Sequence, residues 1–149
     1  KLVFAKSETL APIKIDPVKI ELVLQNLIDN AVKYTHLNGT VTVKTEVIGT
    51  HVQVSVSDTG IGIQANQKDR LFGKFFRGTN AVKLETEGTG LGLFIVKNIL
   101  LRHGGTIRVE TEENKGTTFY VAIPMTGMKA KTDKRKIAGT EFFIKHAII

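Results

Sequence analysis

The 149-residue chain contains no cysteine, which excludes zinc ribbons, thiol catalysis and disulfide-stapled folds and fits a reducing compartment. It also lacks any apolar run near the roughly 18–20 residues of a membrane-spanning helix, and its first residues do not read as a signal peptide. With 42% apolar residues, a chain of this length can bury roughly 68–70% of its unfolded surface and needs no metal to hold a core. We therefore expect a soluble, intracellular globular domain.

Acidic residues are outnumbered, but the excess of positive charge is unevenly placed. The formal net charge is +7. Residues 127–149 hold six basic and two acidic residues, a net charge of +4, whereas the other 126 residues hold 15 basic and 12 acidic, a net charge of +3. No aromatic residues interleave with the basic run 129–136, so we expect no nucleic-acid partner.

Hydrophobic spacing predicts an α+β fold. Asp16-Pro17 reads as a helix cap followed by a helix over 17–35, and a second long helix follows at 91–103. Alternation of apolar and polar residues predicts two antiparallel pairs of strands, and short strands are expected near the N-terminus. Between the pairs we expect a short helix and a long polar loop. The expected strands are 2–5, 13–15, 41–47, 52–56, 106–112 and 117–123, the short helix is 66–76 and the loop is 77–90. This order predicts a two-layer α/β sandwich, with a mixed, mostly antiparallel sheet and its helices on one face.

The first long helix carries polar side chains on one face. Asn26, Asn30, Lys33 and Tyr34 follow one another at helical spacing. An amide oxygen is a hard, neutral ligand suited to Mg²⁺, and a lysine one turn further can reach phosphates. Taken alone, the pattern favours a solvated helix face over a binding site.

Two glycine-rich segments follow. Residues 58–62 (Asp-Thr-Gly-Ile-Gly) come directly after a strand, where a carboxylate can accept from an exocyclic amino group and glycines let a flat ring approach; a simple turn is the alternative. Residues 88–93 (Gly-Thr-Gly-Leu-Gly-Leu) open the second long helix, where successive amides can bind an anion; a hinge is the alternative. Neither a Rossmann fingerprint nor a P-loop fits, because no strand directly precedes residues 88–93 and no Gly-Lys-Ser/Thr follows.

In this order, the segments resemble the ATP-binding domain of sensor histidine kinases, within the group that includes DNA gyrase and mismatch-repair ATPases. Residues 26–35 resemble the N box, 58–63 the G1 box, 71–77 the F box, 88–93 the G2 box and 116–119 the final glycine box. The resemblance covers about residues 2–125 and implies a Bergerat-type fold. It also implies ATP and Mg²⁺ as cofactors.

The resemblance implies a role for each matching residue. Asn30 would ligate Mg²⁺ with support from Asn26, Lys33 would contact the phosphates and Tyr34 would pack on ribose or adenine. Asp58 would accept from the adenine amino group, and Arg77 with the amides of 88–93 would hold the β- and γ-phosphates under a lid formed by residues 78–87. The implied nucleotide-binding set is Asn30, Lys33, Tyr34, Asp58, Gly60, Gly62, Ile63, Arg77, Gly88, Thr89, Gly90, Leu91, Gly92, Leu93, Thr117 and Thr118, and the implied catalytic set is Asn26, Asn30, Lys33 and Arg77.

The implied function is transfer of the γ-phosphoryl group of ATP to a histidine. Hydrolysing members of the group have a glutamate where this chain has Asn26, and an amide cannot accept a proton at neutral pH. The histidines His36, His51, His103 and His146 lack the His-Glu/Asp-x-x-x-Pro context of the phosphorylated helix, so we expect structural or solvated roles for them. The acceptor would lie on separate dimerisation helices, and a response regulator would be the further partner. The alternative is a nucleotide-dependent interaction or sensing module that transfers nothing.

The boundaries and setting are expectations too. We expect the ATP-binding domain over residues 1–126 and a basic, then apolar, tail over 127–149. The resemblance implies a monomeric fragment in the cytoplasm, and it allows a parent protein attached to the inner membrane.

Overall fold

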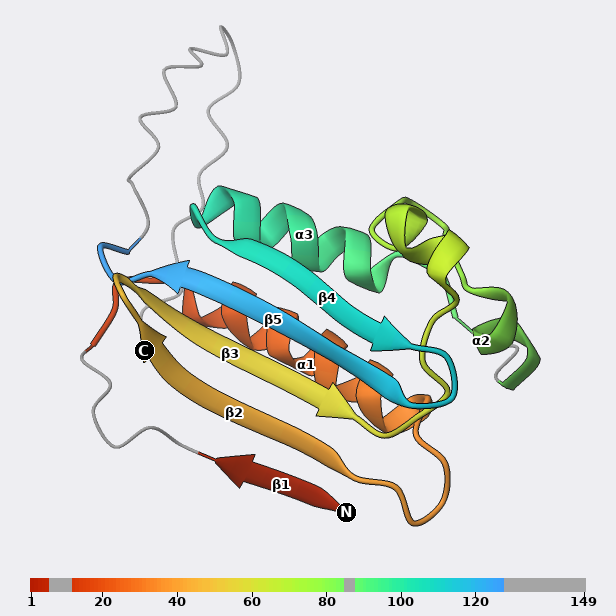
Figure 1. Cartoon of the computed structure of the whole chain (residues 1–149). Helices are drawn as coiled ribbons and strands as arrows, with labels where there is room; N and C mark the ends of the chain where they lie inside the picture. The colour runs from red at the N-terminus through yellow and green to blue at the C-terminus, as the bar shows by residue number, and fades with distance from the viewer. Residues whose placement is uncertain (6–11, 85–87, 128–149) are drawn as a thin grey trace, which may run out of the picture.

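A computed structural model describes residues 1–5, 12–84 and 88–127. These residues form a five-stranded sheet in the order β1-β2-β3-β5-β4, with helices α1 and α3 packed against one face (Figure 1). The strands are β1 (Leu2–Ala5), β2 (Val41–Ile48), β3 (His51–Asp58), β4 (Thr106–Glu112) and β5 (Gly116–Pro124). Only β1 pairs in parallel, with β2, and the other three pairings are antiparallel. The predicted two-layer α+β fold is confirmed.

Helix α1 (Pro17–Lys33) begins where the cap was predicted. The Asp16 side chain accepts a hydrogen bond from the Lys19 amide at 3.1 Å, and Pro17, which has no amide hydrogen to satisfy, occupies the first turn. Four residues at helical spacing turn the apolar face toward the sheet, namely Ile20, Val23, Leu27 and Ala31. The helix ends at Lys33, two residues before the predicted end.

Helix α3 (Gly92–Arg102) is joined to the start of α1 by His103. The His103 ring is 1% exposed, and its Nδ1 lies 2.8 Å from the Ile99 carbonyl oxygen while its Nε2 accepts from the Asp16 amide at 3.3 Å. This pattern assigns the neutral ring with its proton on Nδ1. The expected structural role of His103 follows from these two bonds.

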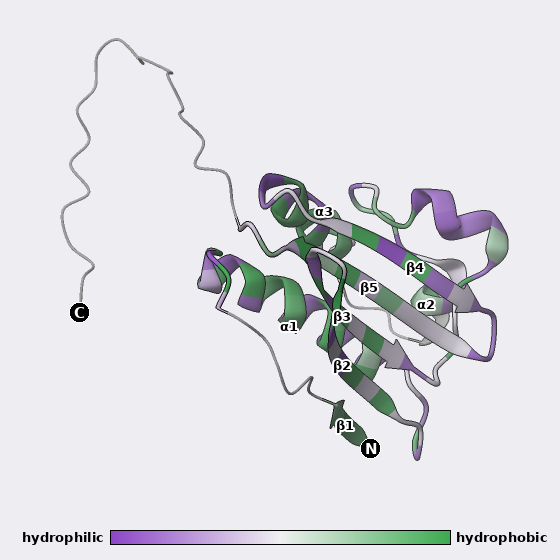
Figure 2. Cartoon of the chain, turned by 60° about the vertical axis from the view of Figure 1, so that its left-hand side comes forward, coloured by the Kyte–Doolittle hydropathy of each residue, from purple (hydrophilic) through white to green (hydrophobic). Residues whose placement is uncertain are grey.

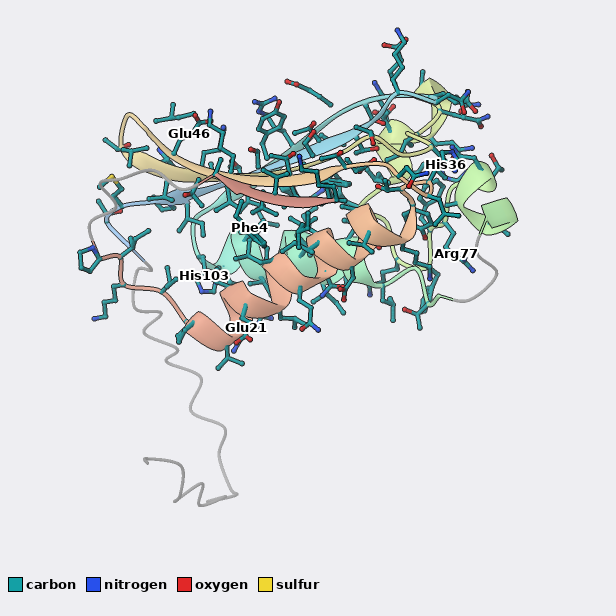
Figure 3. All side chains as sticks on the ribbon, turned by 90° about the horizontal axis from the view of Figure 1, so that it is seen from below. Phe4, Glu21, His36, Glu46, Arg77 and His103 are labelled. Carbon is teal, nitrogen blue, oxygen red and sulfur yellow. The ribbon has the colours of Figure 1, made fainter. Side chains whose placement is uncertain are left out.

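The core lies between the sheet and the two helices, as the edge-on view in Figure 3 shows. Alternate residues of the central strands, such as Val56 and Val121, are fully buried, whereas their neighbours Ser57 and Tyr120 lie on the opposite face, which no described helix covers. Figure 2 shows the resulting alternation of hydropathy along the strands. Among the described residues, no helix has the length and apolar character needed to cross a membrane.

Three predicted elements differ from the structure. Residues 13–15 form no strand and belong to an irregular connection that leads to α1. Within it, Ile15 packs on the core, and the amide of the following residue, Asp16, donates a hydrogen bond to His103 and not to a strand. The predicted helix 66–76 is only a short 3₁₀ helix, η1 (Ala65–Arg70), because the chain turns at Gly73 and Phe75 adopts a φ of 60°. The predicted loop 77–90 contains a short helix, α2 (Thr79–Leu84). The tail 128–149 lies outside the described residues, as do 85–87 of the predicted lid.

Candidate functional site

A cavity of about 120 Å³ lies at the end of the sheet where β3 ends and β5 begins. It is bordered by the last turns of α1, the segment 61–63, residues 76–81 and the start of α3. Nine of the residues singled out from the sequence line it: Asn30, Tyr34, Asp58, Gly62, Ile63, Arg77, Gly90, Leu93 and Thr117. The fold therefore gathers residues from all five motifs around one cavity.

Asp58, the last residue of β3, is 9% exposed and lines this cavity. Its Oδ1 accepts from the Gly60 amide at 2.9 Å and from the Thr117 amide at 3.2 Å. Burial raises the pKa of this carboxyl above its ordinary value, and the hydrogen bonds from the two backbone amides oppose that rise. Within the described residues both hydrogen bonds go to Oδ1, so Oδ2 remains the acceptor available to a molecule in the cavity.

The segment after Asp58 requires glycine at two positions. A Cβ on Gly60 would lie 2.1 Å from the Tyr34 carbonyl oxygen, and one on Gly62 would lie 2.0 Å from the Glu112 carbonyl oxygen. Gly62 also has a φ of +61°, which side chains disfavour. The segment is thus wedged between the end of α1 and the β4–β5 turn, and its backbone forms a fixed wall of the cavity.

The polar side chains of α1 divide between the cavity and the start of α3. Asn30 lines the cavity, and Lys33 is half-buried one turn further. Asn26 donates to the Leu22 carbonyl oxygen at 2.8 Å, and its Oδ1 lies 2.6 Å from where a Cβ on Gly92 would be. Asn26 therefore faces the first turn of α3, and a larger residue at position 92 would displace it.

Arg77 and the glycine-rich segment 88–92 meet at the other side of the cavity. A Cβ on Gly88 would lie 3.6 Å from the Arg77 Cζ, which places the guanidinium beside this segment. Gly90 has a φ of +67° and packs against the Phe75 backbone, and Gly92 is the first residue of α3. A cationic side chain thus adjoins the N-terminal end of an eleven-residue helix, where amides and the helix dipole favour anions.

Eight of the residues singled out from the sequence do not line the cavity, namely Asn26, Lys33, Gly60, Gly88, Thr89, Leu91, Gly92 and Thr118. Most of these adjoin residues that do. Thr118 is different, because its hydroxyl lies 2.8 Å from the Ser57 hydroxyl on the opposite face of the sheet. Neighbouring residues of a strand face opposite sides, so only Thr117 of the two threonines reaches the cavity.

Sequence reasoning did not include the apolar wall in the implied nucleotide-binding set, and it missed one polar side chain. The wall includes Ile61, Leu71, Phe76 and Phe119, which lie within the segments that resemble the G1, F and final glycine boxes. Asn80 lines the cavity from α2, in a segment that was expected to be a loop. Its asparagine type carried no signal that could distinguish it from a solvated loop residue.

Comparison with known proteins identifies the family to which this fold belongs. Residues 15–127 match the family model "Histidine kinase-, DNA gyrase B-, and HSP90-like ATPase". The sensor histidine kinase ZraS of Escherichia coli (strain K12) is 40% identical over 125 residues, which are 84% of this chain and 26% of that protein. The chain thus spans about a quarter of that curated relative.

Solved structures agree. The catalytic domain of histidine kinase ThkA superposes with a TM-score of 0.71 at 34% identity, covering 83% of this chain and 79% of that one. A ThkA structure in complex with the response regulator TrrA gives 0.67 at 32% identity, with coverage of 84% and 34%. Full-length ShkA in complex with AMPPNP gives 0.71 at 30% identity, with coverage of 87% and 26%. The chain therefore belongs to the histidine kinase-, DNA gyrase B- and HSP90-like ATPase family, as the catalytic domain of a sensor histidine kinase.

Proposed function

We propose that this domain binds Mg-ATP in the cavity and donates the γ-phosphoryl group to a histidine on separate dimerisation and phosphoacceptor helices. The observation that carries the proposal is the pairing of two unlike ends in one cavity. Asp58 offers a carboxylate oxygen at one end, and Arg77 adjoins a glycine-rich helix start at the other. An amino-bearing base joined to a polyanion matches these two ends.

Adenine would occupy the Asp58 end. The Asp58 Oδ2 would accept from the exocyclic amino group, and the apolar side chains of Ile61, Phe76 and Phe119 would contact the ring. The close backbone packing at Gly62 leaves no side chain there to exclude it. Tyr34 and Thr117 also border this space and would contact the ribose or the ring.

The phosphates would lie between Arg77 and the segment 88–93, with Lys33 as a further cation. The residues present fit a magnesium ion, because Asn30, whose side chain carries an amide oxygen, lines the cavity and Mg²⁺ takes few protein ligands besides phosphate oxygens and water. Bound there, Mg²⁺ would neutralise charge on the phosphates. Asn26, which adjoins the start of α3, would keep that helix and Asn30 in register.

Two features favour transfer to a partner over hydrolysis. Asn26 supplies no base for activating water, and transfer of a phosphoryl group depends chiefly on positioning and charge neutralisation. His103, with both ring nitrogens engaged, lies at the opposite end of α1 from Arg77 (Figure 3) and is no acceptor for this site. Because the substrate is ATP, the proposal places the domain in the cytoplasm, and the ThkA–TrrA complex supports a response regulator as the downstream partner.

The test supplies the missing partner. The parent protein's dimerisation and phosphoacceptor helices are added in trans with γ-labelled ATP, and acid-labile label is expected on those helices and none on residues 1–149. Asn30→Ala should weaken Mg-ATP binding by roughly 10- to 100-fold, the effect of losing a charge-assisted contact. Gln25→Ala, an exposed change on the same helix, is the matched control.

Each outcome decides between the readings. ATP binding by the wild-type domain without transfer to the added helices would favour a nucleotide-dependent interaction or sensing module. Absence of ATP binding would overturn both readings. Unchanged binding and transfer in Asn30→Ala would remove Asn30 from the metal site.

A further inference from the structure

Helix α2 is too short to be stable alone. It contains six residues, whereas isolated helices shorter than roughly 12–15 residues are marginal in water. Ala81 and Asn80 nevertheless line the cavity, so the position of α2 determines the shape of one wall. Contacts from outside the helix must hold it there.

The Asn80 side chain provides such a contact. Its Nδ2 donates to the Gly62 carbonyl oxygen at 2.9 Å, and its Oδ1 accepts from the Ala81 amide at 3.0 Å. Both halves of the amide are therefore used, and this assigns its orientation. The bond joins α2 to a residue 18 positions earlier in the chain.

The acceptor in this bond is rigid. Gly62 is held against the Glu112 backbone, and the neighbouring Ile63 amide donates to the Thr111 hydroxyl at 2.9 Å. Asn80 thus joins a helix of low intrinsic stability to a fixed wall of the cavity. The start of α2 is also held by three hydrogen bonds of Thr79: its hydroxyl accepts from Gln67 Nε2 at 2.8 Å and donates to Gln64 Oε1 at 3.1 Å, and its amide donates to Gln67 Oε1 at 3.3 Å. Those hydrogen bonds are exposed to water, whereas the one from Asn80 is partly buried.

We propose that Asn80 is a positioning residue for nucleotide binding, which holds α2 against the Gly62 carbonyl and so sets the wall beside the adenine. This inference rests on the proposed function. Without the bond, α2 would move away from Gly62, and bound ATP would leave more readily. The folded core would be unaffected, since none of the α2 residues whose burial the structure describes, 79–82, belongs to it.

The test compares Asn80→Ala and Asn80→Asp with a control on the same helix, Val82→Ala. The Val82 side chain is 42% exposed and does not line the cavity. Stopped-flow release of a fluorescent ATP analogue should accelerate roughly fivefold in both Asn80 variants, the amount expected for one partly buried neutral hydrogen bond. Hydrogen exchange of the α2 amides should accelerate in parallel. The urea midpoint should equal that of the wild type.

Wild-type release rates in both Asn80 variants would overturn the proposal. So would a lower urea midpoint accompanied by equal acceleration in Val82→Ala, because that result would indicate a general structural role. If the wild-type domain bound no ATP, the proposed function would fail instead. The exchange of α2 would then still show whether Asn80 holds this helix.

Discussion

The Asp58 carboxyl combines a structural cost with a binding role. Burial raises its pKa, so ionising it costs the folded state more than the unfolded chain, where its pKa is lower. Its stabilising contribution is therefore greatest below the unfolded pKa and is lost as the pH rises through the raised pKa. The ionised form, however, is the better acceptor for an amino group in the cavity.

Asp58→Asn should separate these two effects. The amide oxygen can keep the bonds from Gly60 and Thr117, but the new NH₂ group would meet the adenine amino group as a second donor. At neutral pH we expect equal or greater resistance to urea, with ATP affinity lower by roughly 10- to 100-fold. The gain in stability should shrink as the pH falls below the raised pKa of the wild-type Asp58.

Calorimetric titration with ATP and urea unfolding across pH 4–8 measure both quantities. Wild-type ATP affinity in the variant would contradict the assigned role of Asp58. A variant less stable than the wild type at every pH would contradict the assigned cost of ionisation.

Helix α1 carries two functions on adjacent faces. Its apolar face packs into the core through Val23 and Leu27, both 0% exposed, while Asn30 on a neighbouring face lines the cavity. Because the same turns serve both, the core fixes the height and rotation at which Asn30 faces the cavity. The Asp16–His103 bond adds a tie between the start of α1 and the end of α3.

Leu27→Ala should lower the free energy of unfolding by about 2–5 kcal/mol, since it removes a fully buried side chain and leaves a cavity. Leu22→Ala, on the same helix but 42% exposed, should cost less than about 1 kcal/mol. Urea unfolding monitored by circular dichroism measures both. Similar losses in the two variants would show that the burial of this face does not govern the stability of the helix.

At the scale of the whole molecule, the described helices α1 and α3 cover one face of the sheet (Figures 1 and 3). The cavity lies at the end of the sheet where β3 ends and β5 begins. The last described residue is Gly127, which is buried and packs against Lys14. Its amide donates a hydrogen bond to the Pro124 carbonyl oxygen at 2.9 Å. All the described contacts of the cavity precede that residue. The net charge of +4 carried by residues 127–149 lies on residues beyond it.

A chain ending at Gly127 should therefore keep its thermal midpoint and its ATP affinity, although its net charge falls from +7 to +3. Differential scanning fluorimetry with and without Mg-ATP, at 50 and 200 mM salt, compares it with the full chain. A lower midpoint or weaker ATP binding in the shorter chain would contradict the predicted domain boundary.

Local features of the fold could be predicted from the sequence because they depend on residues two to four positions apart. The cap at Asp16, the apolar stripe of α1 and the alternation in the strand pairs are of this kind. The order of the asparagine and glycine motifs also indicated the family, which the comparisons confirm. Residues 13–15 misled, because an alternating apolar pattern also suits an irregular segment that packs on the core.

The amino-acid sequence by itself determined the secondary structure of the main elements, the family and most of the candidate residues. Only the tertiary structure decided which of them share a cavity, because that depends on contacts between distant positions. The Thr117 amide donates a hydrogen bond to Asp58, 59 residues away in the chain, and Asn80 donates one to Gly62, 18 residues away. Strand pairing places the Thr118 side chain on the face of the sheet opposite the site. Such contacts form only when packing of the core brings the elements together, and no local pattern encodes them.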